Sequence, residues 1–263
     1  ECAGLVSIEP LHAPRVPGSA GLRLPFTEVH AVPWRDGAAQ LQERCASGQT
    51  GVIVLRGPHM SPGYLDAKRN AGMFEQGWIV TGDLGHLDDA GRIHITGRAK
   101  DVIIRGSHNI DPGLVEDAFL AHPDVALCAV VAEPDAYAGE VPVAFVTLKP
   151  GATLEAEALL TAVAPQVYER PAVPKRVVLL EALPMTAIGK VFKPELRLRA
   201  IEIKLVESLR EWAPGVAARV QALEQGVRQT AVITVAGPQD DALRERLQQG
   251  LAAMAVQTKL RFE

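Results

Sequence analysis

Short apolar runs separated by glycine and proline dominate the first hundred residues, and this pattern limits the fold more than any other feature. The segments GLRLPFTEVHAV (21–32) and GVIVLRG (51–57) are rich in β-branched and apolar residues. The segment DDAGRIHITG (88–97) begins with turn residues and continues in alternation, which predicts a hairpin. Between them, PGYLDAKRNAGMF (62–74) predicts a short helix or a loop. Many short strands and few long helices favour a barrel-like or sandwich-like unit over residues 1–97.

The pattern changes at residue 98. The segment RAKDVIIR (98–105) leads from charged residues into a short apolar strand, as a domain boundary does. In the segment that follows, Asp111 is placed to cap a helix and Pro112 to occupy its first turn. Two apolar strand runs, an amphipathic helix capped by Thr153 and a further strand complete the segment. Residues 98–199 are therefore expected to form a small α+β module of β-α-β-β-α-β order.

Residues 200–263 predict a further small α/β unit. Helices are expected over AIEIKLVESLREWA (200–213), VAARVQALEQGV (216–227) and DDALRERLQQGLAAMAV (240–256). Strands are expected over 230–237 and 258–262. We find no internal repeat and no low-complexity segment.

Composition excludes several classes of protein. The chain has 27 basic and 31 acidic residues and a formal net charge of -4, so no basic excess points to nucleic acid. No apolar run is long enough to span a bilayer. Cys2, Cys45 and Cys128 are scattered and odd in number, without metal-ligand spacing. They fit a reducing compartment, so we expect a cytoplasmic protein. No feature predicts the oligomeric state.

Two residues between positions 77 and 98 could contact a nucleotide. Asp83 is expected on a tight Thr-Gly-Asp turn, where a fixed carboxylate can accept two hydroxyl groups, as a ribose diol requires. The alternative is a turn aspartate that binds its own backbone. Arg98 could fork onto a carboxylate or onto nucleotide oxygens, or it could be a surface arginine.

Two further positions are expected on loops beside strands. Lys190 follows Gly189 in LPMTAIGKVFKPEL (183–196), where a compact ammonium group could meet a phosphate or a carboxylate. It could also be a solvated charge beside a glycine turn. Gly106 follows a strand, and its missing side chain would let another group approach the backbone closely. The alternative is an ordinary strand–turn–helix connection.

Taken in order, TGDLG, GRAKDVIIRGSHNIDPGLVED and LPMTAIGK resemble the C-terminal half of the adenylate-forming superfamily. This family includes acyl-CoA synthetases, nonribosomal adenylation domains and luciferases, and the resemblance runs from Glu1 to about Arg199. It implies a two-step reaction in which ATP activates a carboxylic acid to an acyl-adenylate and a thiol, usually of CoA, then displaces AMP. It also implies that residues 1–97 are the β-rich end of a larger domain and that residues 98–199 rotate between the steps.

The resemblance assigns a role to the first three candidate residues. Asp83 matches the aspartate that holds the ribose hydroxyls. Arg98 matches the arginine that also contacts the nucleotide. Lys190 matches the lysine that bridges the substrate carboxylate and the phosphate during adenylation. Such a role fits phosphoryl chemistry, which depends on positioning and charge neutralisation.

The same resemblance assigns roles to three other positions and shows one departure. Lys100 matches the hinge about which the small domain swings. Gly106 matches the glycine beside the pantetheine tunnel for CoA. Glu1 matches the acid that helps to bind Mg²⁺. The chain departs from the family at Val52, where a glutamate is common.

The sequence begins without methionine, and no glycine-rich triphosphate loop occurs in its 263 residues. We therefore expect the C-terminal part of a longer acid–CoA ligase that is inactive by itself. Two alternatives stay open: a nonribosomal-type adenylation domain that loads a carrier protein, and a non-catalytic binding or oligomerisation module. The sequence does not indicate which carboxylic acid is the substrate.

Overall fold

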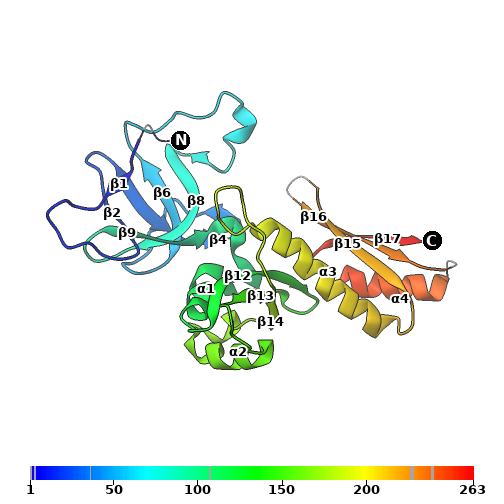
Figure 1. Ribbon diagram of the computed structural model, residues 1–263. Helices are drawn as coiled ribbons and strands as arrows, with labels where there is room; N and C mark the ends of the chain where they lie inside the picture. Colours follow the sequence, from blue (N-terminus) through cyan, green and yellow to red (C-terminus); the bar gives the residue numbers. More distant parts are fainter. Residues whose placement is uncertain (1, 3, 36, 107, 226–227, 238–239) are drawn as a thin grey trace. The chain divides into compact units, whose positions relative to one another are not determined.

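The computed structural model describes all residues except 1, 3, 36, 107, 226–227 and 238–239 (Figure 1). The chain folds into two compact units, Glu1–Asp101 and Val102–Glu263. Both units are rich in strands, and helices occur mainly in the second. The prediction of a strand-rich chain that mixes helices and strands is confirmed. The division into residues 1–97, 98–199 and 200–263 stays a prediction.

Seven strands of the first unit form one antiparallel sheet in the order β1-β2-β9-β8-β6-β3, with β7 paired to β8. The sheet is open, with β1 and β3 at its edges, and it curves into a half-barrel (Figure 1). Its strands are β1 (Ser7–Ile8), β2 (Ser19–Arg23), β3 (Glu28–Val32), β6 (Gly51–Arg56), β7 (Phe74–Glu75), β8 (Trp78–Leu87) and β9 (Arg92–Arg98). Strands β4 (Trp34–Arg35) and β5 (Ala38–Ala39) form a separate short pair.

Alternating apolar residues build the core of this unit. Val29, Ile53, Ile79 and Ile93 come from four different strands and are all at least 95% buried. The predicted hairpin at residues 88–91 is confirmed: the Asp88 carboxylate accepts hydrogen bonds from the backbone of Ala90 and Arg92. The segment 62–74, predicted to be a short helix or a loop, contains one 3-10 turn over Ala67–Arg69.

The second unit is built on a five-stranded sheet. Its order is β11-β10-β13-β12, and β14 pairs with β13 in parallel. Among the described residues of this part are three α-helices, α1 (Pro112–Leu120), α2 (Ala156–Val163) and α3 (Lys193–Trp212), and two short 3-10 helices, η3 (Ala164–Gln166) and η4 (Arg170–Ala172). The strands are β10 (Ile103–Arg105), β11 (His108–Ile110), β12 (Val125–Asp135), β13 (Gly139–Leu148) and β14 (Arg176–Leu179).

Helices cover both faces of this sheet, because β12 and β13 are apolar on both sides. Val130 and Val146 face a core that includes Phe119 of α1 and Leu159 of α2. The alternate residues of the same strands face a second core with α3. The predicted cap of α1 is confirmed, since Asp111 Oδ1 accepts from the Gly113 amide at 2.9 Å.

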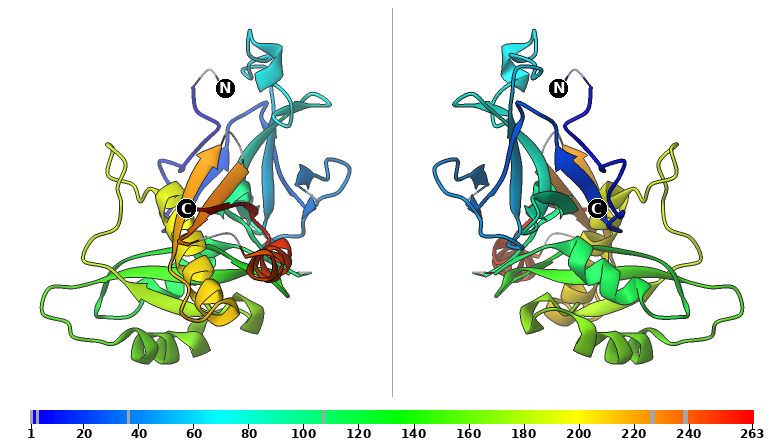
Figure 2. Two further views of the ribbon diagram at one scale, coloured as in Figure 1. Left: turned by 90° about the vertical axis from the view of Figure 1, so that its right-hand side faces the viewer. Right: turned by 90° about the vertical axis from the view of Figure 1, so that its left-hand side faces the viewer.

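A three-stranded sheet of order β15-β16-β17 follows α3. It consists of β15 (Ala218–Gln225), β16 (Arg228–Val235) and β17 (Gln257–Phe262), with α4 (Asp241–Ala252) between the last two strands. The C-terminal half of α3 and α4 pack on the same face of this sheet (Figures 1 and 2). One helix, α3, thus contributes to the cores of both sheets.

Three expectations about helices are wrong. Residues 216–227 were expected to be helical, but Ala218–Gln225 form strand β15, because Val220 and Ala222 alternate toward the core and pair with β16. Thr153 does not cap α2, whose cap residue is Glu155. The helix expected from residue 200 begins at Lys193. None of the helices that the structure describes is both long and apolar enough to cross a membrane.

Candidate functional site

The structure brings Asp83 and Arg98 together. They lie directly opposite one another on the neighbouring antiparallel strands β8 and β9. Arg98 Nε contacts Asp83 Oδ1 at 2.7 Å, and both side chains are accessible, with exposed fractions of 57% and 31%. This contact uses one carboxylate oxygen and one guanidinium nitrogen. The pair can therefore still present a second carboxylate oxygen and further N–H groups to a ligand.

A bulge in β8, rather than the expected turn, places Asp83. Val52 and Val54 of β6 are paired with Leu84 and Val80, so three residues of β8 lie opposite Ile53 alone. The Thr81 hydroxyl donates to the Ile53 carbonyl at 2.8 Å and accepts from the Asp83 amide at 3.0 Å. Gly82 has a φ of 73°, which favours glycine. The Thr-Gly-Asp sequence therefore encodes a bulge inside a strand.

Lys100 lies on the short 3-10 helix η2 (Ala99–Asp101) and is exposed. The boundary between the two units follows this helix, between residues 101 and 102. Only Ala99 of the helix is buried. The location agrees with a hinge, although the hinge role itself stays a prediction.

Gly106 borders a large pocket in the second unit. Its φ is 58°, and its amide donates to the Ala138 carbonyl at 2.8 Å. The pocket has a volume of about 1310 Å³. Its lining combines apolar residues with several cations: Arg105, Gly106, His108, Tyr137, Ala138, Ala164, Val167, Arg170, Pro171, Val173, Pro174 and Lys175. An apolar pocket with cations at its wall suits a long ligand that carries phosphate groups.

Lys190 lies on an exposed loop over residues 184–192, here called the lysine loop. Met185 and Val191 form an antiparallel bridge, and the Phe192 amide donates to the Pro184 carbonyl at 2.7 Å. At the tip, the Thr186 hydroxyl accepts from the Lys190 amide at 3.0 Å, and Gly189 has a φ of 77°. The loop thus has a closed neck and a structured turn that presents the exposed lysine.

An ion pair that includes Lys193, the residue after this loop, was not expected from the sequence. Lys193 Nζ lies 2.7 Å from Glu116 Oε1, and both side chains are largely buried. The same Glu116 oxygen accepts from the Val130 amide at 2.6 Å. Burial raises the pKa of Glu116, and Lys193 opposes this effect. Lys193 is the first residue of α3, where a cation is unfavourable, and this feature of the sequence could have pointed to an acidic partner.

The remaining predictions concern metal and substrate positions. Glu1, predicted to help bind Mg²⁺, lies outside the described residues. Within the part of the chain that the structure describes, no three His, Cys, Asp or Glu residues are grouped so that they could hold a metal ion. Val52 is fully buried in β6.

These features define a class: a strand-rich unit with an Asp–Arg pair, joined to an α/β unit with a glycine-turn lysine loop. Residues 114–190 match the family described as the AMP-binding enzyme C-terminal domain. The match includes α1 from Leu114 onward, the central strands and the lysine loop as far as Lys190. The resemblance to the C-terminal portion of adenylate-forming acyl-CoA ligases is confirmed.

Individual relatives agree with this class. The chain is 42% identical over 198 residues to a marinolic acid–CoA ligase of Pseudoalteromonas sp. (strain SANK 73390), covering 75% of this chain and 30% of the relative. It is 38% identical over 197 residues to an indoleacetate–CoA ligase of Aromatoleum aromaticum, covering 74% and 37%. The crystal structure of ATP-bound MatB from Rhodopseudomonas palustris is similar, with a TM-score of 0.66 and 32% identity over 74% of this chain and 38% of that one. The chain thus spans about a third of the length of these relatives.

Proposed function

We propose that this chain is the C-terminal part of an acid–CoA ligase. In the first step, a carboxylate oxygen attacks the α-phosphorus of ATP, and pyrophosphate leaves. In the second step, the thiol of CoA attacks the acyl carbon, and AMP leaves. Without the triphosphate loop, these 263 residues are not expected to adenylate an acid by themselves.

The contact between Asp83 and Arg98 carries this proposal. The sequence suggested a nucleotide role for each residue separately, and they lie opposite one another at 2.7 Å. A carboxylate that is held by a bulge and oriented by an arginine is a preorganised acceptor for the two ribose hydroxyls. The ribose is present in ATP and in the acyl-adenylate, so we expect this pair to act in both steps.

Lys190 is assigned to the first step only. Its ammonium group would neutralise charge between the attacking carboxylate and the α-phosphate. Exposure on a loop suits a residue that is present in one step and withdrawn in the other. The pocket beside Gly106 is assigned to CoA, with Arg170 and Lys175 available to its phosphate groups.

Measuring the two half-reactions separately in the longer ligase that contains this chain tests the proposal. Lys190→Ala should abolish acid-dependent ATP–pyrophosphate exchange and largely spare thioester formation from preformed acyl-adenylate. Asp83→Ala should impair both reactions. Lys68→Ala and Asp89→Ala, which change exposed residues of the same types, serve as controls. Equal loss of both steps in Lys190→Ala would refute the role of the lysine. Unchanged activity in Lys190→Ala and Asp83→Ala would favour a non-catalytic module.

A further inference from the structure

We propose that the ion pair between Lys193 and Glu116 is a positioning device that sets where the lysine loop leaves the folded unit. This inference rests on the proposed function, because it concerns the adenylation role of Lys190. Neither residue is expected to touch the substrate. Both would act through the backbone that carries Lys190.

One carboxylate oxygen joins three elements at this point. Glu116 Oε1 from α1 accepts from the Val130 amide of β12 at 2.6 Å and contacts Lys193 Nζ of α3 at 2.7 Å. The side chains of Lys193 and Glu116 are only 21% and 17% exposed. A charge-assisted contact of this length, partly shielded from water, is strongly directional.

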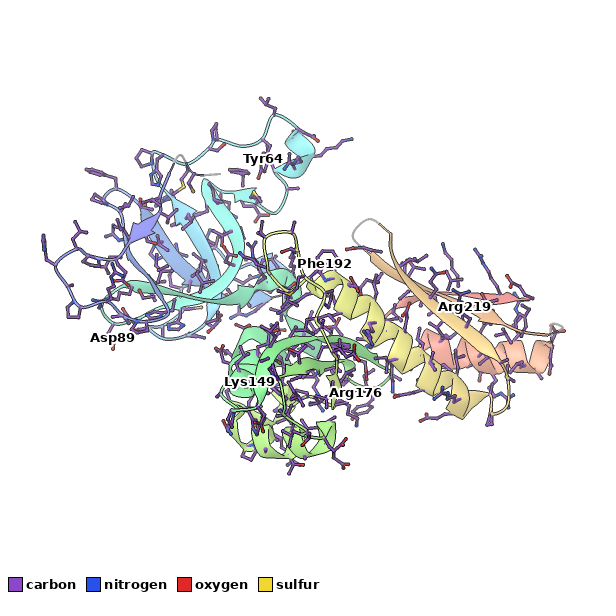
Figure 3. The ribbon with its side chains drawn as sticks, viewed as in Figure 1. Tyr64, Asp89, Lys149, Arg176, Phe192 and Arg219 are labelled. Carbon is purple, nitrogen blue, oxygen red and sulfur yellow. The ribbon has the colours of Figure 1, made fainter. Side chains whose placement is uncertain are left out.

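The pair lies directly at the neck of the lysine loop. Phe192, labelled at the start of α3 in Figure 3, donates its amide to the Pro184 carbonyl and closes the neck. Lys193 is the next residue and the first of α3. It follows Lys190 by three residues, a span of at most about 10 Å of extended chain. Because this span is short, a change in the direction of the neck would also move Lys190.

Val191 at the neck packs against the core that contains Leu183 and Leu196, so the neck is held by apolar contacts as well as by the ion pair. The hydrogen bonds at the tip, which join Thr186 to Gly189 and Lys190, are internal to the loop. Ile188 at the tip is 80% exposed. The cap residue of α3 makes no side-chain capping hydrogen bond. The ion pair is thus a side-chain attachment of the neck to α1 and β12.

A lysine at this position is unfavourable for helix α3, since a cation lies at the positive end of the helix dipole. A buried ion pair is also a poor source of net stability compared with apolar packing. Both observations favour a geometric role over a stabilising one. Lys193→Met should accordingly fold, because Glu116 keeps the Val130 hydrogen bond and, with its raised pKa, can take up a proton.

Four variants of the longer ligase test this proposal: Lys193→Met, Lys193→Arg, the exposed same-helix control Arg199→Met, and the reference Lys190→Ala. Lys193→Met should lower ATP–pyrophosphate exchange about tenfold to a hundredfold, the scale expected for a misplaced reacting group. Thioester formation from preformed acyl-adenylate should be little changed. Lys193→Arg, which keeps the charge, should restore most of the exchange activity, and Arg199→Met should behave as wild type.

Hydrogen exchange of the segment 184–192 in the same variants separates this proposal from the proposed function. Lys193→Met should accelerate exchange of the Phe192 amide. If Lys190→Ala leaves adenylation intact, the proposed function fails, and hydrogen exchange alone then decides whether the pair orders the loop. Two results would overturn the positioning role. One is unchanged hydrogen exchange of the segment 184–192 in Lys193→Met. The other is an equal loss of both half-reactions in Lys193→Met that Lys193→Arg does not restore.

Discussion

The Thr81 hydroxyl makes two hydrogen bonds within the bulge that presents Asp83, and Thr81→Val tests how much they contribute. Valine has nearly the shape of threonine, so the substitution removes two hydrogen bonds and little else. The bonds are Thr81 Oγ1 to the Ile53 carbonyl at 2.8 Å and the Asp83 amide to Thr81 Oγ1 at 3.0 Å. Ile53 is only 3% exposed, so its carbonyl has little access to water as a replacement donor.

The expected cost follows from these two contacts. Each hydrogen bond contributes about 0.5–1.5 kcal/mol net, so Thr81→Val should lower the free energy of unfolding of the first unit by about 1–3 kcal/mol. Thr81→Ser is the matched control, because it keeps the hydroxyl and loses one methyl group, worth up to about 0.8 kcal/mol. Thr81→Val should also reduce both half-reactions, since Asp83 would lose its fixed position opposite Arg98.

Urea unfolding followed by tryptophan fluorescence measures this difference. In a Trp212→Phe background the remaining tryptophans, Trp34 and Trp78, both report on the first unit. A Thr81→Val variant that is as stable as Thr81→Ser would refute the argument, because the hydroxyl would then contribute nothing to the bulge.

Two further predictions concern the second unit. Gly250→Ala would place a Cβ 2.8 Å from the ring of Trp212. We therefore expect the free energy of unfolding to fall by about 1–2 kcal/mol and the amide hydrogens of β16 to exchange faster. Adding Trp212→Leu should reverse both effects, because the smaller side chain removes the clash. Unchanged exchange would show that α4 can shift at no cost. Burial raises the pKa of Glu140 above its ordinary value of 4.5, so the unfolded carboxyl loses its proton at a lower pH than the folded one. The stabilising effect of the protonated form is lost as the pH rises through the folded pKa. Glu140→Gln, which can still accept from the Ile104 amide, should therefore be more stable than wild type at neutral pH and no more stable below pH 4.5, as measured by urea midpoints. An equal advantage at both pH values would contradict this assignment.

Local signals in the sequence determined several features correctly. Asp111 and Pro112 predicted the start of α1, and the Asp-Asp-Ala-Gly run predicted the turn between β8 and β9, with Asp89 at its tip (Figure 3). Both depend on side chains that bind the backbone a few residues away, so their partners are close in the sequence. The ordered motifs likewise indicated the class of enzyme, because each combines a glycine-dependent backbone shape with one functional side chain.

Features that depend on distant partners were decided only by the tertiary structure. The segment 216–227 carries apolar residues that fit a helix or a strand, and pairing with β16 selected the strand. Asp83 was expected on a turn, but a bulge places it, because β6 continues to pair on both sides of the Thr-Gly-Asp sequence. The contact of Lys193 with Glu116 joins residues 77 positions apart, and no local pattern specifies it. The sequence by itself determined which side chains are available and how the chain turns beside them. The packing of sheets and helices decided which of these side chains meet, because burial and strand pairing act between segments that are far apart in the chain.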